Sequence, residues 1–213
     1  MAKQNRVTPE GNIIASATRG TFMGNRGILH NDQQEIVKPF AHKAWIICLL
    51  SFKGRQRQVM QPGNYTELFF LDEATALAAG HRPCFECRRP AAEAFRMAWL
   101  AGNPQFGFGN SVRAGEMDKM LHVERLTKAF YIKDRKKKTY TAVLDTLPNG
   151  TFILWQERPY LVWEDALLPW QPAGYGSPLS RPRGKQAAVL TPPSTTAALA
   201  QGYQPALHES AYF

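Results

Sequence analysis

The chain has 213 residues, of which 44% are hydrophobic and 20% are charged, a composition typical of a folded globular protein and not of a disordered one. The longest mainly apolar run, residues 44–52, is too short to span a membrane, and the polar N-terminus lacks the apolar core of a signal peptide, so we expect a cytoplasmic protein with no membrane partner. Lysine and arginine outnumber aspartate and glutamate by 26 to 17, and the net charge of +9 favours a polyanionic partner such as nucleic acid over a role in solubility alone.

The first regular elements that the sequence predicts are two strands and a short helix. Residues 43–52 (KAWIICLLSF) form a mainly apolar run of strand length, and residues 66–71 (TELFFL) form a second. Asp72 then stands where a helix N-cap is expected, and residues 73–79 predict a short alanine-rich helix that Gly80 ends. The segment after Gly80 therefore follows a helix and not a strand.

Two longer helices are expected in the middle of the chain. Pro90 suits the first turn of a helix over residues 90–100, whose apolar face would carry Phe95 and Trp99. A second helix is predicted for residues 116–130. Its apolar side would consist of Met120, Val123, Leu126 and Phe130.

The C-terminal half adds strands and an extended segment. Residues 139–147 and 151–155 flank a Pro-Asn-Gly turn and predict a β-hairpin. Beyond Trp170 the chain becomes rich in proline, glycine and serine, which predicts an extended connector. A short helix is expected near residues 194–201.

Cys84 and Cys87 form a C-x-x-C motif in a short turn. This spacing lets two thiolates reach one tetrahedral zinc ion at about 2.3 Å each. A thioredoxin-like redox pair is an alternative, but it needs a strand leading into the motif within a βαβ unit, and here a short helix leads in. Two buried cysteines without a ligand are a third interpretation. An odd count of three cysteines makes no disulfide framework and favours reduced thiols or metal ligands.

Residues 69–87 (FFLDEATALAAGHRPCFEC) resemble the second half of the zinc-binding domain of the Ada family, which repairs methylphosphotriesters in DNA. The shared pattern is an aromatic pair, a short helix around Ala-Leu-Ala-Ala-Gly, and an Arg-Pro-Cys-x-x-Cys knuckle. The resemblance implies a zinc-binding fold and contact with DNA. The family takes its other two zinc ligands from an upstream C-x-x-x-C pair, one of which accepts the methyl group, whereas this chain has only Cys48 upstream. Methyl transfer to cysteine is therefore not expected.

Two further zinc ligands must come from elsewhere, since a closed structural site needs four. We favour His30, which closes a glycine-rich loop, and Cys48, which lies on the first predicted strand; His42 is another candidate. A small buried hydrophobe is the alternative role of Cys48. His81 is expected to face solvent.

Basic side chains are the predicted nucleic-acid contacts. Residues 133–138 (KDRKKK) form a dense cationic run that suits phosphate contacts, although lysines also protect exposed strand edges. The predicted set comprises Arg26, Arg55, Arg57, Arg88, Arg89, Arg135, Lys136, Lys137 and Lys138.

A second polar group has the composition of a catalytic site. Asp118, His122 and Arg125 fall on one face of the second long helix, where a carboxylate one turn before a histidine is able to orient it as a general base. Asn25, in the glycine-rich loop that His30 closes, is a further candidate. An ordinary exposed helix face with an acid–base pair is the plainer interpretation.

These features predict an α+β fold, with a small mixed sheet, flanking helices and an extended C-terminal tail. We expect an Ada-like zinc-containing region over residues 1–105, a helix and hairpin packed on it over 106–170, and a Pro/Gly-rich extension over 171–213. The functional hypothesis is a zinc-containing protein that binds nucleic acid, DNA in preference to RNA, in repair or damage recognition. The alternatives are a glycosylase or nuclease that uses Asp118 and His122, and a zinc-stabilised protein-interaction module.

Overall fold

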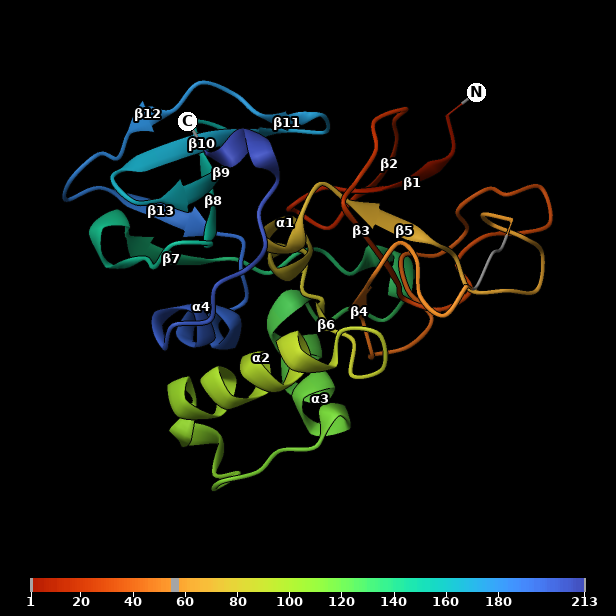
Figure 1. The fold of residues 1–213 in the computed structure, drawn as a ribbon, viewed down its shortest axis with the longest axis horizontal. Coiled ribbons are helices and arrows are strands. Elements are labelled where there is room, and N and C mark those ends of the chain that lie inside the picture. The colour runs from red at the N-terminus through yellow and green to blue at the C-terminus, as the bar shows by residue number, and fades with distance from the viewer. Residues whose placement is uncertain (1, 55–57, 213) are drawn as a thin grey trace.

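The structure, a computed structural model, describes residues 2–54 and 58–212 and contains two β-sheets with helices beside and between them (Figure 1). The predicted α+β class is therefore confirmed. Among the described residues, the helices are α1 (Glu73–Ala78), α2 (Arg89–Gly102), α3 (Ala114–Arg125) and α4 (Pro193–Ala200). Short 3-10 helices span Pro104–Phe106, Ile132–Asp134, Leu144–Thr146 and Glu209–Ala211.

The first sheet is mixed and has the strand order β2-β1-β5-β3-β4-β6. Its strands are β1 (Gln4–Val7), β2 (Ile13–Ala15), β3 (Phe22–Asn25), β4 (Ile46–Cys48), β5 (Leu68–Phe70) and β6 (Arg82–Pro83). The pairs β1–β5 and β4–β6 are parallel, and the other neighbours are antiparallel. Both predicted strands form, each shorter than its apolar run.

Helix α1 begins and ends as the sequence predicts. The Asp72 carboxylate accepts a hydrogen bond of 2.8 Å from the Thr75 N–H, which satisfies one free donor of the first turn. Gly80 follows with a φ of +92°, a left-handed conformation that glycine adopts without strain. The helix lies between the two sheets, since Ala76 and Leu77 join the core of the first sheet while Ala74 and Ala78 join that of the second.

Helix α2 is confirmed, whereas the prediction for α3 is partly wrong. Pro90 lies in the first turn of α2, and Phe95 and Trp99 are fully buried. Helix α3 ends at Arg125 and not at residue 130, because Leu126 is extended and bridges to Lys137. Two of the four residues on its predicted apolar side are exposed, Val123 at 58% and Phe130 at 93%, whereas Met120 and Leu126 are half-buried. The buried residues of α3 are Met117, Asp118, Leu121, His122 and Arg125.

The second sheet corrects the predicted hairpin. Its order is β11-β10-β9-β8-β13-β7, with β12 beside β10. Strand β13 lies between β7 and β8, so these two strands do not pair with each other, and β8 forms its hairpin with β9. The strands are β7 (Tyr140–Val143), β8 (Phe152–Trp155), β9 (Arg158–Trp163), β10 (Ala166–Gln171), β11 (Gly174–Tyr175), β12 (Leu179–Ser180) and β13 (Gln186–Val189).

Residues 171–213 thus contribute β11, β12, β13 and the predicted short helix α4. Helix α4 packs against α2 at Gly102, where an added Cβ would lie 2.6 Å from the Ala197 carbonyl oxygen. The carboxylates of Asp72 and Glu73 bind this part of the chain to α1, since they accept hydrogen bonds of 2.6 Å from the hydroxyls of Tyr175 and Tyr203, respectively.

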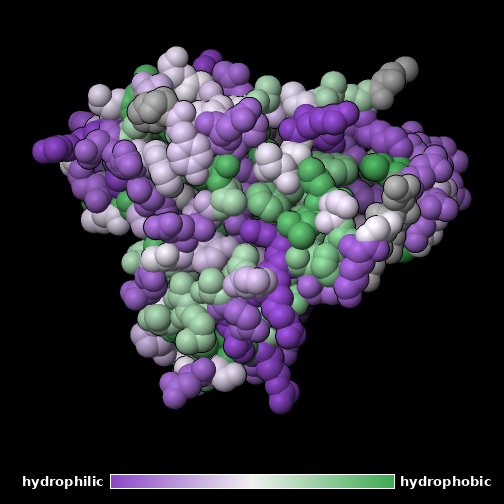
Figure 2. All heavy atoms as spheres, viewed as in Figure 1, coloured by the Kyte–Doolittle hydropathy of each residue, from purple (hydrophilic) through white to green (hydrophobic). Residues whose placement is uncertain are grey.

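One face of the molecule has a hydrophobic area surrounded by polar side chains (Figure 2). Figure 2 shows hydrophobic atoms gathered over the middle of one face, where β3, β4 and β5 lie in Figure 1, with hydrophilic side chains around them. No helix of the described residues is long and apolar enough to cross a membrane.

Candidate metal centre

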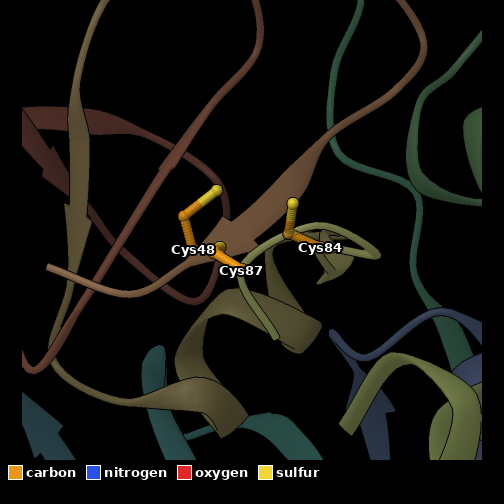
Figure 3. Close-up of side chains that lie close together, drawn as sticks. All are labelled: Cys48, Cys84 and Cys87. Carbon is orange, nitrogen blue, oxygen red and sulfur yellow. The ribbon is translucent and has the colours of Figure 1, made fainter. Parts of the chain in front are cut away.

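Three cysteine side chains meet at the edge of the first sheet, where β4 pairs with β6. The sulfur atoms of Cys48, Cys84 and Cys87 all lie within 4.8 Å of one another (Figure 3). Cys48 is the last residue of β4, and the other two lie in the turn between β6 and α2. The prediction that these three cysteines lie together is confirmed, and they form a group that could hold a metal ion.

Backbone hydrogen bonds set this geometry. The Cys84 N–H donates to the Ile47 carbonyl oxygen at 3.0 Å, which continues the parallel β4–β6 pairing past Pro83. The chain then turns, and the Arg88 N–H donates to the Cys84 carbonyl oxygen at 3.0 Å. The Glu86 N–H points at the Cys84 sulfur at 3.4 Å, an orientation that stabilises a thiolate. These backbone hydrogen bonds therefore hold the knuckle in place.

The three thiols have different acidities. Hydrogen bonding from the Cys48 thiol lowers the pKa of Cys84 to about 5, against the opposing effect of burial, with backbone N–H groups assisting. The same hydrogen bond to Cys84, together with burial, raises the pKa of Cys48. Burial also raises the pKa of Cys87. Zinc binds cysteine as the thiolate, so a bound cation would displace the protons that these thiols carry.

The donor set fits zinc. Thiolates are soft ligands that bind zinc at about 2.3 Å, so two sulfurs of a tetrahedral site stand about 3.8 Å apart. The observed cluster, with its sulfurs within 4.8 Å of one another, needs only a small contraction to reach that spacing. Three protein ligands leave a fourth position, which catalytic zinc sites keep for water or substrate.

A cavity of about 250 Å³ opens beside the sulfurs. Its polar lining includes Asn25, Tyr65, Glu67 and Glu86, and the remainder is mainly apolar. Glu67 is only 4% exposed, and one of its carboxylate oxygens accepts a hydrogen bond of 2.8 Å from the Met60 N–H. The other oxygen, Oε1, has no hydrogen-bond partner within residues 2–54 and 58–212. An unpartnered buried carboxylate oxygen next to a metal-binding cluster indicates a ligand.

The prediction of His30 as a zinc ligand is wrong, because its ring lies elsewhere. His30 Nδ1 is 2.6 Å from the Thr66 hydroxyl, Nε2 is 3.3 Å from the Gln61 carbonyl oxygen, and the residue is not part of the cysteine group. The expectation that His81 faces solvent is also wrong, since its exposed fraction is 0%. Its ring packs against Trp45 and Phe70, and burial holds its pKa well below the ordinary value.

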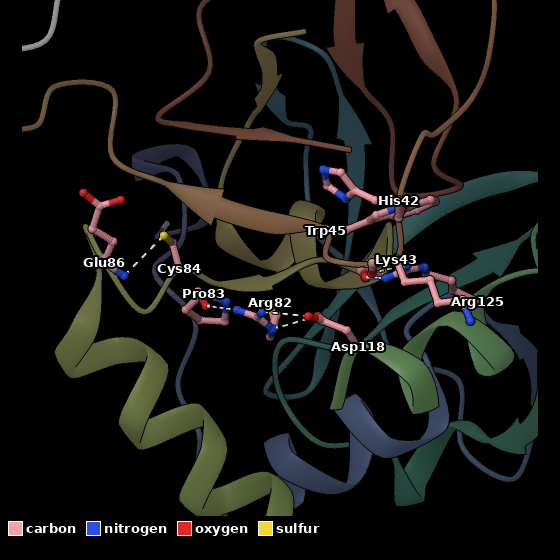
Figure 4. A network of polar contacts seen from close by, with 10 residues as sticks. His42, Lys43, Trp45, Arg82, Pro83, Cys84, Glu86, Asp118 and Arg125 are labelled. Atoms are coloured by element: carbon pink, nitrogen blue, oxygen red, sulfur yellow. Dashed lines mark hydrogen bonds and ion pairs between the residues drawn. The ribbon is translucent and has the colours of Figure 1, made fainter. Parts of the chain in front are cut away.

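The predicted catalytic group does not form a dyad. Asp118 makes a bidentate ion pair with Arg82, with both N–O distances at 2.8 Å (Figure 4). His122 instead lies 3.1 Å from Arg125 Nη2 and 3.0 Å from Arg135 Nη1, and among the described residues no hydrogen bond or ion pair joins it to Asp118. Burial, assisted by these arginines, lowers the pKa of His122 to about 4.

The predicted nucleic-acid contacts fall into four groups. Arg55 and Arg57 lie outside the described residues. Arg88 is buried and bidentate with Glu73, at 2.8 Å for both contacts, so it is no surface contact. Exposed positions hold Arg89, Lys136 and Lys138, whereas Arg26 is buried and Arg135 and Lys137 are half-buried.

Glu67 was missed at the sequence level, although a weak signal was present. It is the one charged residue in the run 66–71, directly before the buried strand β5. A carboxylate beside a buried strand needs a partner or a function.

No protein-family model matches the chain, and no curated protein or solved structure matches it either.

Proposed function

We propose that this chain is a zinc-containing protein that binds nucleic acid, with DNA preferred over RNA. The observation that carries the proposal is the convergence of Cys48, Cys84 and Cys87 from two separate segments. This arrangement disfavours a thioredoxin-like redox pair, because such a pair uses only two sulfurs and leaves the third cysteine unexplained. It also disfavours buried cysteines without a ligand, because core cysteines of that kind have no reason to cluster.

The nucleic-acid part of the proposal rests on charge and on resemblance. The net charge of +9 and the exposed side chains of Arg89, Lys136 and Lys138 favour phosphate contacts. The resemblance of residues 69–87 to the Ada zinc-binding domain favours DNA, in repair or damage recognition. Methyl transfer is not part of the proposal, since Phe52 stands where a C-x-x-x-C pair starting at Cys48 would place its second cysteine.

Metal content tests the zinc site directly. Elemental analysis of the purified chain is expected to find about one zinc ion per chain, and Cys84→Ser is expected to lose most of it, with an affinity at least ~100-fold lower. His30→Gln serves as the matched control and should retain zinc, because the His30 ring contacts Thr66 and Gln61. Wild-type protein that stays metal-free under zinc saturation would overturn the proposal.

Salt-dependent DNA binding tests the nucleic-acid part of the proposal. Fluorescence anisotropy with a labelled duplex should show affinity that falls steeply with salt, and the double variant Lys136→Gln/Lys138→Gln should reduce the salt slope by about 2. A zinc-loaded protein that binds no DNA at low salt would contradict nucleic-acid binding and favour a protein-interaction module instead.

The unpartnered oxygen of Glu67 favours a second candidate, a zinc-dependent enzyme that acts on nucleic acid. A zinc ion with an open position lowers the pKa of a water molecule bound there to about 7. Glu67 lines the same cavity as the three cysteines, and its Oε1 has no hydrogen-bond partner among the described residues, so we assign it the role of general base. The enzyme would use this face and not the predicted group of Asp118 and His122.

Substitution of Glu67 in cobalt-loaded protein separates the two candidates. Glu67→Gln should bind one Co²⁺ ion with the wild-type intensity of sulfur-to-metal charge-transfer bands, because the three cysteines are unchanged. The enzyme candidate expects this metal-loaded variant to lose turnover of nucleic-acid substrates, because the proton acceptor is gone. A variant that binds the metal and retains wild-type turnover would exclude Glu67 as the proton acceptor.

A further inference from the structure

A second cavity, of about 220 Å³, lies close to the metal centre but is lined by different residues of the same chain segments. Asn25 and Ile46 line the cavity of the cysteines, whereas their chain neighbours Arg26 and Trp45 line the second one. The charged side chains of this second cavity are Arg26, Arg125, Arg135, Lys136, Lys137 and Glu10. Five cations thus face one carboxylate.

Arg26 is the deepest of these cations, with an exposed fraction of 1%. Its Nη1 donates to the Gly11 carbonyl oxygen at 3.0 Å, and its Nε donates to His81 Nε2 at 3.2 Å. Its Nη2 has no hydrogen-bond partner in the part of the chain that the structure describes. This nitrogen lies 3.8 Å from the point where a Cβ added to Gly11 would stand. Gly11 lines the cavity, so the free donor is on the cavity side of Arg26.

Arg125 reaches the same cavity from α3 and is also 1% exposed. Its Nη1 and Nη2 donate to the carbonyl oxygens of Gly80 and Lys43 at 2.8 and 2.7 Å, and its Nε has no partner in residues 2–54 and 58–212. The guanidinium groups of Arg26 and Arg125 both stack on Trp45, at 3.9 and 3.8 Å from the ring (Figure 4 shows Arg125 and Trp45). The aromatic ring therefore holds two cations in fixed orientations.

These cations outnumber the carboxylates near them, which include Glu10 beside Lys137 and Asp118 beside Arg125. Among the described residues, the salt bridges do not include Arg26, Arg125 or Lys137. Burial lowers the pKa of Arg26 to about 9, and burial together with Arg26 and Arg125 lowers that of Lys137 to about 7. Unpaired buried charges are costly, and an anion in the cavity would remove that cost.

We propose that this cavity binds a phosphate group. Two guanidinium groups and a lysine offer several donors to one anion, and guanidinium groups bind phosphate oxygens in a bidentate manner. A phosphate carries up to about two negative charges near neutral pH, so it offsets more of the cationic charge than a single carboxylate does. The cavity is large enough for such a group, since a water molecule occupies about 30 Å³.

The phosphate site deepens the nucleic-acid half of the proposed function, because it names the chemical group that is bound. It is independent of the metal centre, since no cysteine lines it. Two sources share this chemistry, free inorganic phosphate and the terminal phosphate of a nucleic acid. A cavity of this size takes a terminal group and not the continuous backbone of a duplex.

Calorimetric titration with inorganic phosphate, against chloride at matched ionic strength, tests the site. Wild-type protein should bind one phosphate per chain and unfold at a higher temperature in its presence. Lys137→Met should weaken binding at least ~10-fold, because Lys137 lines the cavity and holds only the Ala78 carbonyl oxygen. Lys119→Met is the matched control, with the same charge change on an exposed residue of α3 that does not line the cavity, and should bind as wild type does.

Absence of phosphate binding by the wild type, or equal losses in the two variants, would overturn the inference. The wild-type measurement decides the matter even where a variant is unstable. Competition by a 5′-phosphorylated oligonucleotide, and not by its 5′-hydroxyl form, would support the site with a terminal phosphate as ligand; phosphate binding without competition would support it with the free ion. Duplex binding that persists without phosphate binding would overturn only this inference, and phosphate binding without duplex binding would overturn only the proposed function.

Discussion

Two neighbouring cavities in this protein carry opposite chemistry. The first gathers three sulfurs and the Glu67 carboxylate, which suit a cation. The second gathers five cationic side chains, which suit an anion. Both use the same two segments, because adjacent residues of extended chain point in opposite directions, so that Asn25 and Arg26 serve different cavities. Two short strands are therefore sufficient to separate a metal centre from a cationic pocket.

The two cavities share one further property. Each contains a deeply buried polar atom without a partner in the described residues, Glu67 Oε1 in the first and Arg26 Nη2 in the second. A buried group of this kind costs about 1–3 kcal/mol when it stays unsatisfied. The free energy of unfolding should therefore rise when either ligand binds, and each cavity is open to separate tests.

The largest loss of stability is expected when the ion pair that links the cysteine turn to α3, beside the second cavity, is broken. Arg82 precedes the cysteine knuckle, and its partner Asp118 lies on α3, the helix that also carries Arg125. Arg82→Met should lower the free energy of unfolding by about 3–5 kcal/mol, because it leaves the buried Asp118 carboxylate without its partner. Urea unfolding of the zinc-loaded protein measures the change.

The exposed ion pair of α2 provides the control. Arg96 and Glu93 are 2.7 Å apart, with 30% and 42% of their side chains exposed, so Arg96→Met should cost less than about 1 kcal/mol. Equal losses in Arg82→Met and Arg96→Met would show that the buried pair does not join the two regions.

The sequence predicted the metal centre better than its surroundings. Cys84 and Cys87 form a local motif, and Asp72 and Gly80 are local helix signals, so all four followed from short-range chemistry. The error at His30 was non-local, because its ring is held by Thr66, 36 residues away. No spacing rule reports such a pairing.

The cationic pocket escaped prediction for a related reason. Polar positions on a helix are expected to face solvent, yet Asp118, His122 and Arg125 are all buried, since arginines from other elements contact the first two and backbone carbonyls hold the third. The exposed residues of α3 include the apolar Val123 as well as Lys119. Strand β13 was missed because its partners in the sheet lie far away in sequence.

A change in the shared strand should affect both cavities together. A Cβ at Gly24 would lie 2.1 Å from the Ile46 carbonyl oxygen and 2.9 Å from the Phe70 ring, so Gly24→Ala must push β3 away from β4. We expect a loss of up to about 3 kcal/mol in the free energy of unfolding, with weaker binding of both zinc and phosphate. Thermal unfolding and calorimetry measure the two consequences.

Gly115→Ala is the matched control, because an added Cβ at this position of α3 meets nothing within 4 Å. It should be neutral or stabilise the helix by up to about 1 kcal/mol. If Gly24→Ala impairs zinc binding and leaves phosphate binding intact, the two cavities do not depend on the common strand.

The smallest effect is expected from His122, which belongs to the cationic region alone. Burial, with Arg125, Arg135 and Lys43 nearby, lowers its pKa from 6.5 to about 4 in the folded chain. Above pH 6.5 the ring is neutral in both the folded and unfolded states. As the pH falls from 6.5 to about 4, the unfolded state takes up the proton first, so this group lowers the free energy of unfolding, by about 2 kcal/mol once solvent screening of the partly exposed ring is allowed for.

His122→Gln should remove this part of the pH dependence, as measured by urea unfolding at several pH values in phosphate-free buffer. The control His208→Gln should retain this pH dependence, because His208 is hydrogen-bonded to Ser210 beside the second sheet and not to the cationic region. Bound phosphate offsets the charge of Arg125 and Arg135, so adding phosphate should reduce the His122 contribution as well. A contrary result would be protein that binds phosphate while the pH dependence contributed by His122 stays unchanged. That result would place the anion away from His122 and from Arg125 and Arg135, which contact this histidine.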